Sequence, residues 1–437
     1  MVKPLMDNPP EPKKRENGRV KMIRQYELIT PLFGGGPTPG EVDPVTPIRG
    51  TEIRGQLRFW WRATRGGRFN TLEELRSEEE RVWGSASKAS EISIAVIRYQ
   101  KGESWSTVTV PKKKEGRTTT ETVGVGDPDS PYSYVAFPLR DTNHYLLKDV
   151  KFALRLHFPV HAKQDVQAAL WAWETFGGIG ARTRRGFGAL HCKECKVVSG
   201  DTSQEEWFWE YECDSIEEQL EKHLEEFVAQ ENLSNELASV TCLQRGNLNE
   251  WLKVSGKQSD ADEVWKYLFG KLSEFRQNRP KGKYGRSNWP EPDAIRRITG
   301  KNHYPTEKDE RKFVYDDIDK FPRAAFGLPI IFQFKDEKQG DPQQVTLEGK
   351  EDKYSRLASP LILRPLACND GFVGLALILN SPDPEQIPGG LTLKSEKKHI
   401  KTNLTAKLEE NELEAISKHH PQIGKQPDIL KAFLRTL

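Results

Sequence analysis

The chain has 437 residues, of which 36% are hydrophobic and 30% are charged, a composition typical of a globular protein of two or three domains. Its 66 basic and 64 acidic residues leave a net charge of +2, so the total charge identifies no class of partner. No run approaches the roughly 20 apolar residues of a membrane helix, and the charged, proline-rich residues 1–19 lack the apolar core of a secretory signal. We therefore expect a cytoplasmic protein that contacts no membrane and begins with a disordered arm over residues 1–19.

Residues 20–200 alternate between strand and helix patterns. Strands are predicted at 20–32, 91–98, 151–158 and 187–198, and helices at 52–66, 71–83 and 164–177. Thr71 precedes the second helix and Glu74 follows three positions later, a spacing typical of a capping box. The order strand, helix, strand, strand, helix, strand is that of a ferredoxin-like domain. We place an N-terminal domain at residues 20–200, with a linker around 199–206.

The second half of the chain, residues 201–437, has a less regular pattern. Helices are predicted at 214–230, 261–275 and 427–436, and strands at 325–334, 343–348, 359–366 and 372–379. Basic stretches at 100–135 and 276–312 are expected to be insertions, the first of them a long hairpin or a mobile segment. The fold class is therefore α+β, with a C-terminal domain at 201–437 that carries helical insertions.

Five cysteines at wide spacing predict no disulfide framework. Cys192 and Cys195 form a lone C-x-x-C pair, whereas a structural zinc site needs four ligands. Free cysteines are commonly buried on strands, and this is the preferred interpretation over zinc. We expect no metal and no cofactor.

The predicted helix at 52–66 has an apolar face and an arginine face. At 100° per residue its four arginines fall within about 80° of one another, Trp61 borders them, and Arg49 lies just upstream. No Asp or Glu occurs between Ile53 and Asn70, so an anionic partner such as a nucleic-acid backbone explains the arginines better than a solvated charged face does. The candidate RNA-binding residues on this helix are Arg49, Arg54, Arg58, Trp61, Arg62 and Arg65.

A second basic segment, GGIGARTRRGFG at 177–188, combines five glycines with three arginines. It follows a helix and precedes a strand, which excludes a dinucleotide-binding fingerprint or a P-loop. Glycines permit close approach of the backbone to a ligand, so this loop is predicted to contact a nucleic-acid backbone; the alternative is a mobile surface loop. Its candidate residues are Gly178, Gly180, Arg182, Arg184, Arg185 and Gly186.

The segments TPIRGTEIRGQLRFWWRATRGG and GGIGARTRRGFGAL together resemble the RAMP (repeat-associated mysterious protein) superfamily. More narrowly, they resemble the first subunits of the Cmr effector complexes of type III-B CRISPR systems. The resemblance implies two ferredoxin-like (RRM-like) domains in tandem and no nuclease activity. It also implies partners: CRISPR RNA and target single-stranded RNA, contacted near the 3′ end of the guide, and other Cmr-complex subunits.

Two other functions stay open at this point. One is a RAMP-type endoribonuclease that processes CRISPR RNA, for which His157, His161 and His191 are the candidate acids and bases. The other is a protein–protein adaptor whose arginines pair with acidic partners.

Overall fold

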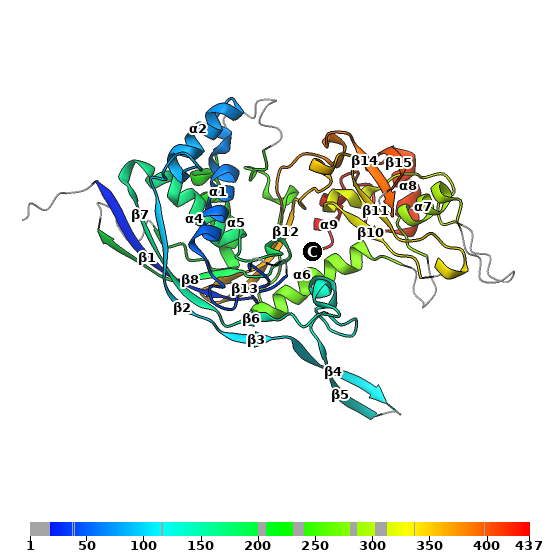
Figure 1. Cartoon of the computed structure of the whole chain (residues 1–437), viewed down its shortest axis with the longest axis horizontal. Helices are drawn as coiled ribbons and strands as arrows, with labels where there is room; N and C mark the ends of the chain where they lie inside the picture. The colour runs from blue at the N-terminus through cyan, green and yellow to red at the C-terminus, as the bar shows by residue number, and fades with distance from the viewer. Residues whose placement is uncertain are drawn as a thin grey trace, which may run out of the picture.

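A computed structural model describes residues 18–36, 38, 40–114, 117–199, 207–229, 240–279, 286–301, 313–335, 337–396 and 398–437. The expected arm at 1–19 lies outside the described residues except for its last two positions, and most of the linker at 199–206 lies outside as well. In Figure 1 the described chain forms two lobes, with the N-terminal sheet, its helices and the strands of residues 361–378 on one side and the strands of residues 330–349 and 391–404 on the other.

The first lobe is built on a four-stranded antiparallel sheet in the order β2-β7-β1-β8. Its strands are β1 (Arg19–Leu28), β2 (Ser93–Gln100), β7 (Lys151–Pro159) and β8 (Leu190–Ser199). Helices α1 (Gly50–Arg65), α2 (Leu72–Trp83) and α4 (Lys163–Phe176) lie over one face of this sheet. Alternate residues of β1 are buried, as expected for a strand with one face on a core.

The first helices begin and end where the sequence predicts. Thr71 is the N-cap of α2, and its hydroxyl accepts a hydrogen bond from the Glu74 amide at 3.2 Å. The Glu74 carboxylate returns to the amide of Asn70, one position before the N-cap. These contacts satisfy amides that the first turn of a helix leaves without partners.

The insertion at 100–135 contains the expected hairpin. Strands β4 (Thr107–Lys114) and β5 (Arg117–Gly124) pair along their length and project away from both lobes in Figure 1. The short strands β3 (Glu103–Trp105) and β6 (Leu146–Lys148) pair at its base, beside α3 (Ser133–Ala136). Two isolated strands have little apolar surface to bury, so this arm depends on its base for stability.

The second half contains two further antiparallel sheets. One has the order β12-β13-β9 and the other the order β10-β11-β14-β15. The strands are β9 (Leu252–Val254), β10 (Ile330–Phe332), β11 (Val345–Gly349), β12 (Leu361–Cys368), β13 (Gly371–Ile378), β14 (Leu391–Ser395) and β15 (Lys398–Leu404). The helices are α5 (Ile216–Phe227), α6 (Ala261–Arg276), α7 (Glu291–Thr299), α8 (Glu410–His419) and α9 (Ile429–Leu434). Sequence patterns missed β9, β14, β15, α7 and α8.

A fully buried arginine joins the two halves. Arg364 of β12 donates hydrogen bonds to the carbonyls of Glu174 at 2.6 Å, Gly177 at 2.9 Å and Leu190 at 2.9 Å. The first two are carbonyls at the C-terminal end of α4, which no helical amide satisfies. Burial lowers the pKa of Arg364 to about 9. The contact between the two halves of the chain therefore combines a specific polar anchor with a shared apolar core.

Candidate nucleic-acid interface

The outward-facing arginines of α1 meet a carboxylate from the neighbouring helix. Glu79, a buried residue of α2, accepts a hydrogen bond from Arg58 Nε at 2.7 Å and another from Arg62. About a third of each arginine side chain stays exposed, 34% for Arg58 and 32% for Arg62. The premise that these arginines lack an acidic partner is wrong, because tertiary structure supplies one. Two guanidinium groups on one carboxylate still leave a surplus positive charge, and Glu79 fixes their direction.

A groove of about 510 Å³ lies beside these arginines, between α1 and residues 83–93. Arg54 and Arg58 contribute to its wall, together with Lys88 and three serines, and none of its lining residues is acidic. Arg54 is held there by the carbonyls of Trp83 at 3.1 Å and Ile92 at 3.2 Å. Burial and the neighbouring Arg58 lower the pKa of Arg54, so an anion in the groove would relieve an existing repulsion.

Lys88 was not among the residues selected from the sequence. It stands alone in the polar stretch SASKAS after α2, and one lysine in a loop is usually a solvated surface charge. Only the return of this loop against α1 places Lys88 in the same groove as Arg54 and Arg58.

Trp61 cannot stack on a base in this structure, contrary to the sequence prediction. It is 0% exposed, and its indole Nε1 donates to Asp165 Oδ1 of α4 at 3.0 Å. The same carboxylate accepts from Arg68 at 2.7 Å and lies 3.7 Å from Arg65. The helical projection placed Trp61 at the edge of the arginine face, but α4 covers that edge. Through Asp165, the C-terminal end of α1 therefore packs against α4.

The N-terminal end of α1 is tied to loops on either side. Arg49 donates to the carbonyl of Gly35. Glu52 accepts the amide of Gly180 at 2.7 Å, which connects α1 to the glycine-rich loop. Both predicted segments are thus neighbours in space, although Arg49 is directed at the protein's own backbone.

The glycines of residues 177–188 permit close packing within the protein. Gly180 and Gly186 both have a φ of +84°, in the left-handed region that favours glycine. A Cβ atom on Gly186 would lie 2.6 Å from the Trp265 ring, and one on Gly178 would lie 2.9 Å from the Gly188 carbonyl oxygen. The predicted close approach is present, but its partner is the chain itself.

The three arginines of this loop also contact the protein. Arg184 donates to the Ser359 carbonyl, and Arg185 donates to the Leu361 carbonyl at 3.0 Å, so both hold the start of β12. Burial lowers the pKa of Arg185 to about 10. Arg182 lies 4.9 Å from the centre of the exposed Phe137 ring. The loop is therefore an ordered contact between the two halves of the chain, and the mobile-loop alternative does not describe it.

The three histidines considered for catalysis each have a charged neighbour. Arg19 Nε donates to His157 Nε2 at 3.3 Å, His161 Nε2 lies 2.9 Å from Glu91, and His191 Nδ1 lies 3.4 Å from Glu27. They lie on β7, on the turn after it and on β8. Burial lowers the pKa values of both His157 and His191.

The part of the chain that matches a known family contains both α1 and the glycine-rich loop. Residues 25–191, which contain α1, α2, α4 and the strands β2 and β7, match the RAMP superfamily model. The chain is 28% identical over 186 residues to the CRISPR system Cmr subunit Cmr1-2 of Pyrococcus furiosus, covering 38% of this chain and 92% of that protein. It is 26% identical over 153 residues to subunit Cmr1-1 of the same organism, covering 33% and 40%.

Two solved structures show a weaker likeness. Apo Cmr1 from P. furiosus matches with 18% identity and a TM-score of 0.44, over 91% of this chain and 96% of that one. A chain of the type III-B Cmr-beta complex bound to cognate target RNA matches with 15% identity and a TM-score of 0.46, over 95% and 100%.

These findings confirm the resemblance read from the sequence. Residues 25–191 are similar to the RAMP superfamily. Over 186 and 153 residues, the chain is similar to the two Cmr1 subunits of P. furiosus. None of the helices in the described part of the chain is long and apolar enough to cross a membrane.

Proposed function

We propose that this protein is an RNA-contacting, non-catalytic subunit of a type III-B CRISPR (Cmr) effector complex. Its RNA partners are the CRISPR RNA and the target single-stranded RNA, contacted near the 3′ end of the guide, and its protein partners are other Cmr subunits. The homology to Cmr1 supports the complex, and the groove beside α1 supports the contact with RNA.

The observation that carries the RNA contact is the charge of the groove. Three cations line it, no lining residue is acidic, and Glu79 holds Arg58 and Arg62 in place from behind. Guanidinium groups bind phosphate oxygens through pairs of parallel hydrogen bonds, and positioning them in advance reduces the entropy lost on binding. Contacts of this type depend on the backbone of the nucleic acid, so we expect strong salt dependence and little sequence preference.

Because Trp61 is buried, Phe59 replaces it as the candidate aromatic residue for stacking on an RNA base. Phe59 is half-buried and lines a pocket of about 270 Å³ between α1 and the glycine-rich loop, together with Gln56 and Arg184. Arg184 lies 5.5 Å from the centre of the Phe59 ring. An aromatic side chain beside a cation accepts an unstacked base of any sequence.

The strand orders support a tandem of ferredoxin-like domains. The first sheet, β2-β7-β1-β8, has the order that a strand-helix-strand-strand-helix-strand chain produces. The sheet β12-β13-β9, with α6 following β9, has the order of the first three strands of the same unit. In the described residues this second sheet lacks the fourth strand, and the strands β10, β11, β14 and β15 form a separate inserted sheet.

The experiment that tests the proposal is fluorescence anisotropy of the purified chain with labelled single-stranded RNA, duplex RNA and single-stranded DNA. A salt series gives the number of phosphate contacts from the slope of log K against log[salt]. Salt-sensitive binding of single-stranded RNA, which gels show to stay intact, is expected. Cleavage of repeat RNA in EDTA would support the endoribonuclease instead, and binding to a sister Cmr subunit without affinity for RNA would support the adaptor.

A further inference from the structure

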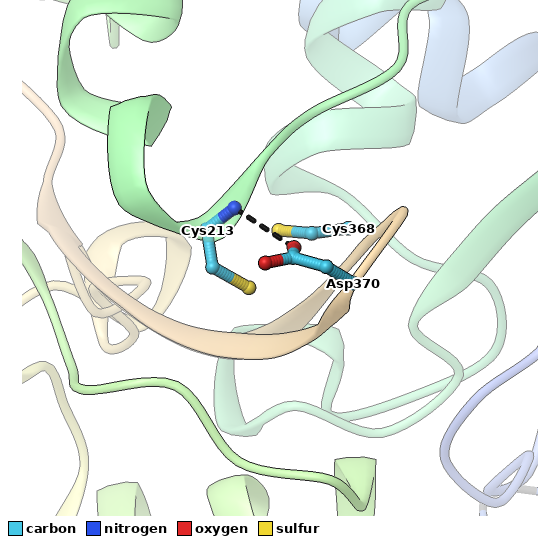
Figure 2. Close-up of side chains that lie close together, drawn as sticks. All are labelled: Cys213, Cys368 and Asp370. Carbon is cyan, nitrogen blue, oxygen red and sulfur yellow. Dashed lines mark hydrogen bonds between the residues drawn. The ribbon is translucent and has the colours of Figure 1, made fainter.

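Three potential metal ligands from distant parts of the sequence meet in the second half of the protein. Cys213 begins the short helical turn Cys213–Ser215 before α5. Cys368 ends β12, and Asp370 lies in the turn between β12 and β13. Figure 2 shows the two thiols and the carboxylate directed toward one another. Among the described residues, this is the single group of three or more such side chains close enough to hold an ion.

The distances suit a tetrahedral site. One ligand atom from each of the three residues lies within 4.8 Å of the other two. Zinc holds sulfur at about 2.3 Å and carboxylate oxygen at about 2.0–2.2 Å, which places neighbouring ligands about 3.5–3.8 Å apart in a tetrahedron. Closing around an ion therefore requires side-chain movements of about 1 Å or less. Two of the ligands share one hairpin, so little backbone has to shift.

Two neighbouring groups orient and neutralise the carboxylate of Asp370. The amide of Cys213 donates to Asp370 Oδ1 at 3.0 Å, the contact drawn in Figure 2, and this fixes the carboxylate. The ammonium group of Lys257 binds the other oxygen. Two thiolates and one carboxylate exceed a divalent ion by one negative charge, and Lys257 offsets that charge. Contacts that orient and neutralise ligands in this way are typical of metal sites.

We propose that Cys213, Cys368 and Asp370 bind one zinc-class divalent ion, with water in the fourth position. Cys213 is buried, Cys368 is half-buried and Asp370 is exposed, so the ion can enter from solvent. The ion joins the segment that leads into α5 to the β12–β13 hairpin. The site does not depend on the proposed RNA contact.

The C-x-x-C pair on β8 serves as an internal contrast. Cys195 Sγ accepts a hydrogen bond from the buried guanidinium of Arg24 at 3.2 Å. Among the described residues, no third cysteine, histidine or carboxylate lies close enough to this pair to complete a metal site. Cys192→Ser therefore removes a cysteine without touching the proposed site.

The test is Co²⁺ titration of the full, reduced chain, followed by absorption spectroscopy. We expect one Co²⁺ per chain, with a thiolate-to-cobalt charge-transfer band and visible bands of a tetrahedral ion, displaced by one equivalent of Zn²⁺. Cys213→Ser and Cys368→Ser should abolish the charge-transfer band, whereas Cys192→Ser should keep it. Asp370→Asn should keep part of the band and lower the affinity at least tenfold.

Three results would overturn the site: no charge-transfer band, the same band in Cys368→Ser, or loss of the band in Cys192→Ser alone. A chain that forms a Cys213–Cys368 disulfide in air and binds no Co²⁺ after reduction would also overturn it. Circular dichroism of each variant separates loss of the ion from loss of the fold. Because RNA binding is measured separately, failure here leaves the proposed function standing.

Discussion

Replacing Arg58 and Lys88 together by alanine removes two of the three cations that line the groove beside α1. Each phosphate contact with a single strand contributes about 0.7 to the slope of log K against log[salt]. Losing both contacts should flatten the slope by about 1.4 and weaken binding about 25-fold at ~0.1 M salt. Arg62 keeps its bond to Glu79, so the packing of α1 on α2 is preserved.

Fluorescence anisotropy with labelled single-stranded RNA over a salt series measures both quantities. Lys418→Ala with Arg435→Ala is the matched control, because it removes two exposed cations from the C-terminal region and should leave the slope unchanged. Glu79→Gln should act in the opposite direction and tighten binding at low salt, since it removes the negative charge between Arg58 and Arg62. An unaltered slope in the groove variant, or an equal loss in the control, would refute the groove as the RNA site.

Three further predictions concern stability and are read from urea unfolding. In the unmodified protein, the buried Arg24 donates hydrogen bonds to Glu174 at 2.9 and 2.7 Å. Glu174→Gln should lower the free energy of unfolding by about 3–5 kcal/mol, because it leaves Arg24 without its counter-charge. A loss below about 1 kcal/mol would contradict this expectation. Gly186→Ala should lower the free energy of unfolding by about 2–4 kcal/mol, because the added Cβ atom strains the backbone and overlaps the Trp265 ring. Gly55→Ala, at an open position on α1, should raise the free energy of unfolding by about 0.5–1 kcal/mol. Equal effects of the two variants would show that the loop tolerates a side chain. Burial lowers the pKa of His223 to about 4, below its value of about 6.5 in the unfolded chain, so stability should fall between pH 6.5 and 4 and His223→Gln should flatten that fall.

Local elements of the first lobe were predictable from sequence because they depend on periodicity. Residues of β1 alternate between buried and exposed positions, and Thr71 caps α2 through its hydroxyl. The resemblance to the RAMP superfamily was also visible in the residues of α1 and the glycine-rich loop, and the family comparison confirms it. The second half was harder because short strands such as β9 contain three residues, too few to show a period.

The surroundings of each side chain could not be predicted, because they depend on segments far apart in the chain. The sequence gives Arg58 and Arg62 no nearby acid, yet α2 brings Glu79 to both. It places Trp61 at the edge of a polar face, yet α4 covers it and supplies Asp165. It gives the loop at 177–188 the composition of a phosphate-binding segment, yet Arg184 and Arg185 donate hydrogen bonds to carbonyls at the start of β12.

The sequence by itself therefore determined most of the secondary structure of residues 20–200, the resemblance to the RAMP superfamily, and the two basic segments. Only the tertiary structure decided which of those arginines face a groove, which hold β12 against the N-terminal half, and that Cys213 and Cys368 meet at Asp370. The physical reason is that periodicity and turn chemistry act over a few residues, whereas burial, charge pairing and ligand clusters depend on contacts between distant elements.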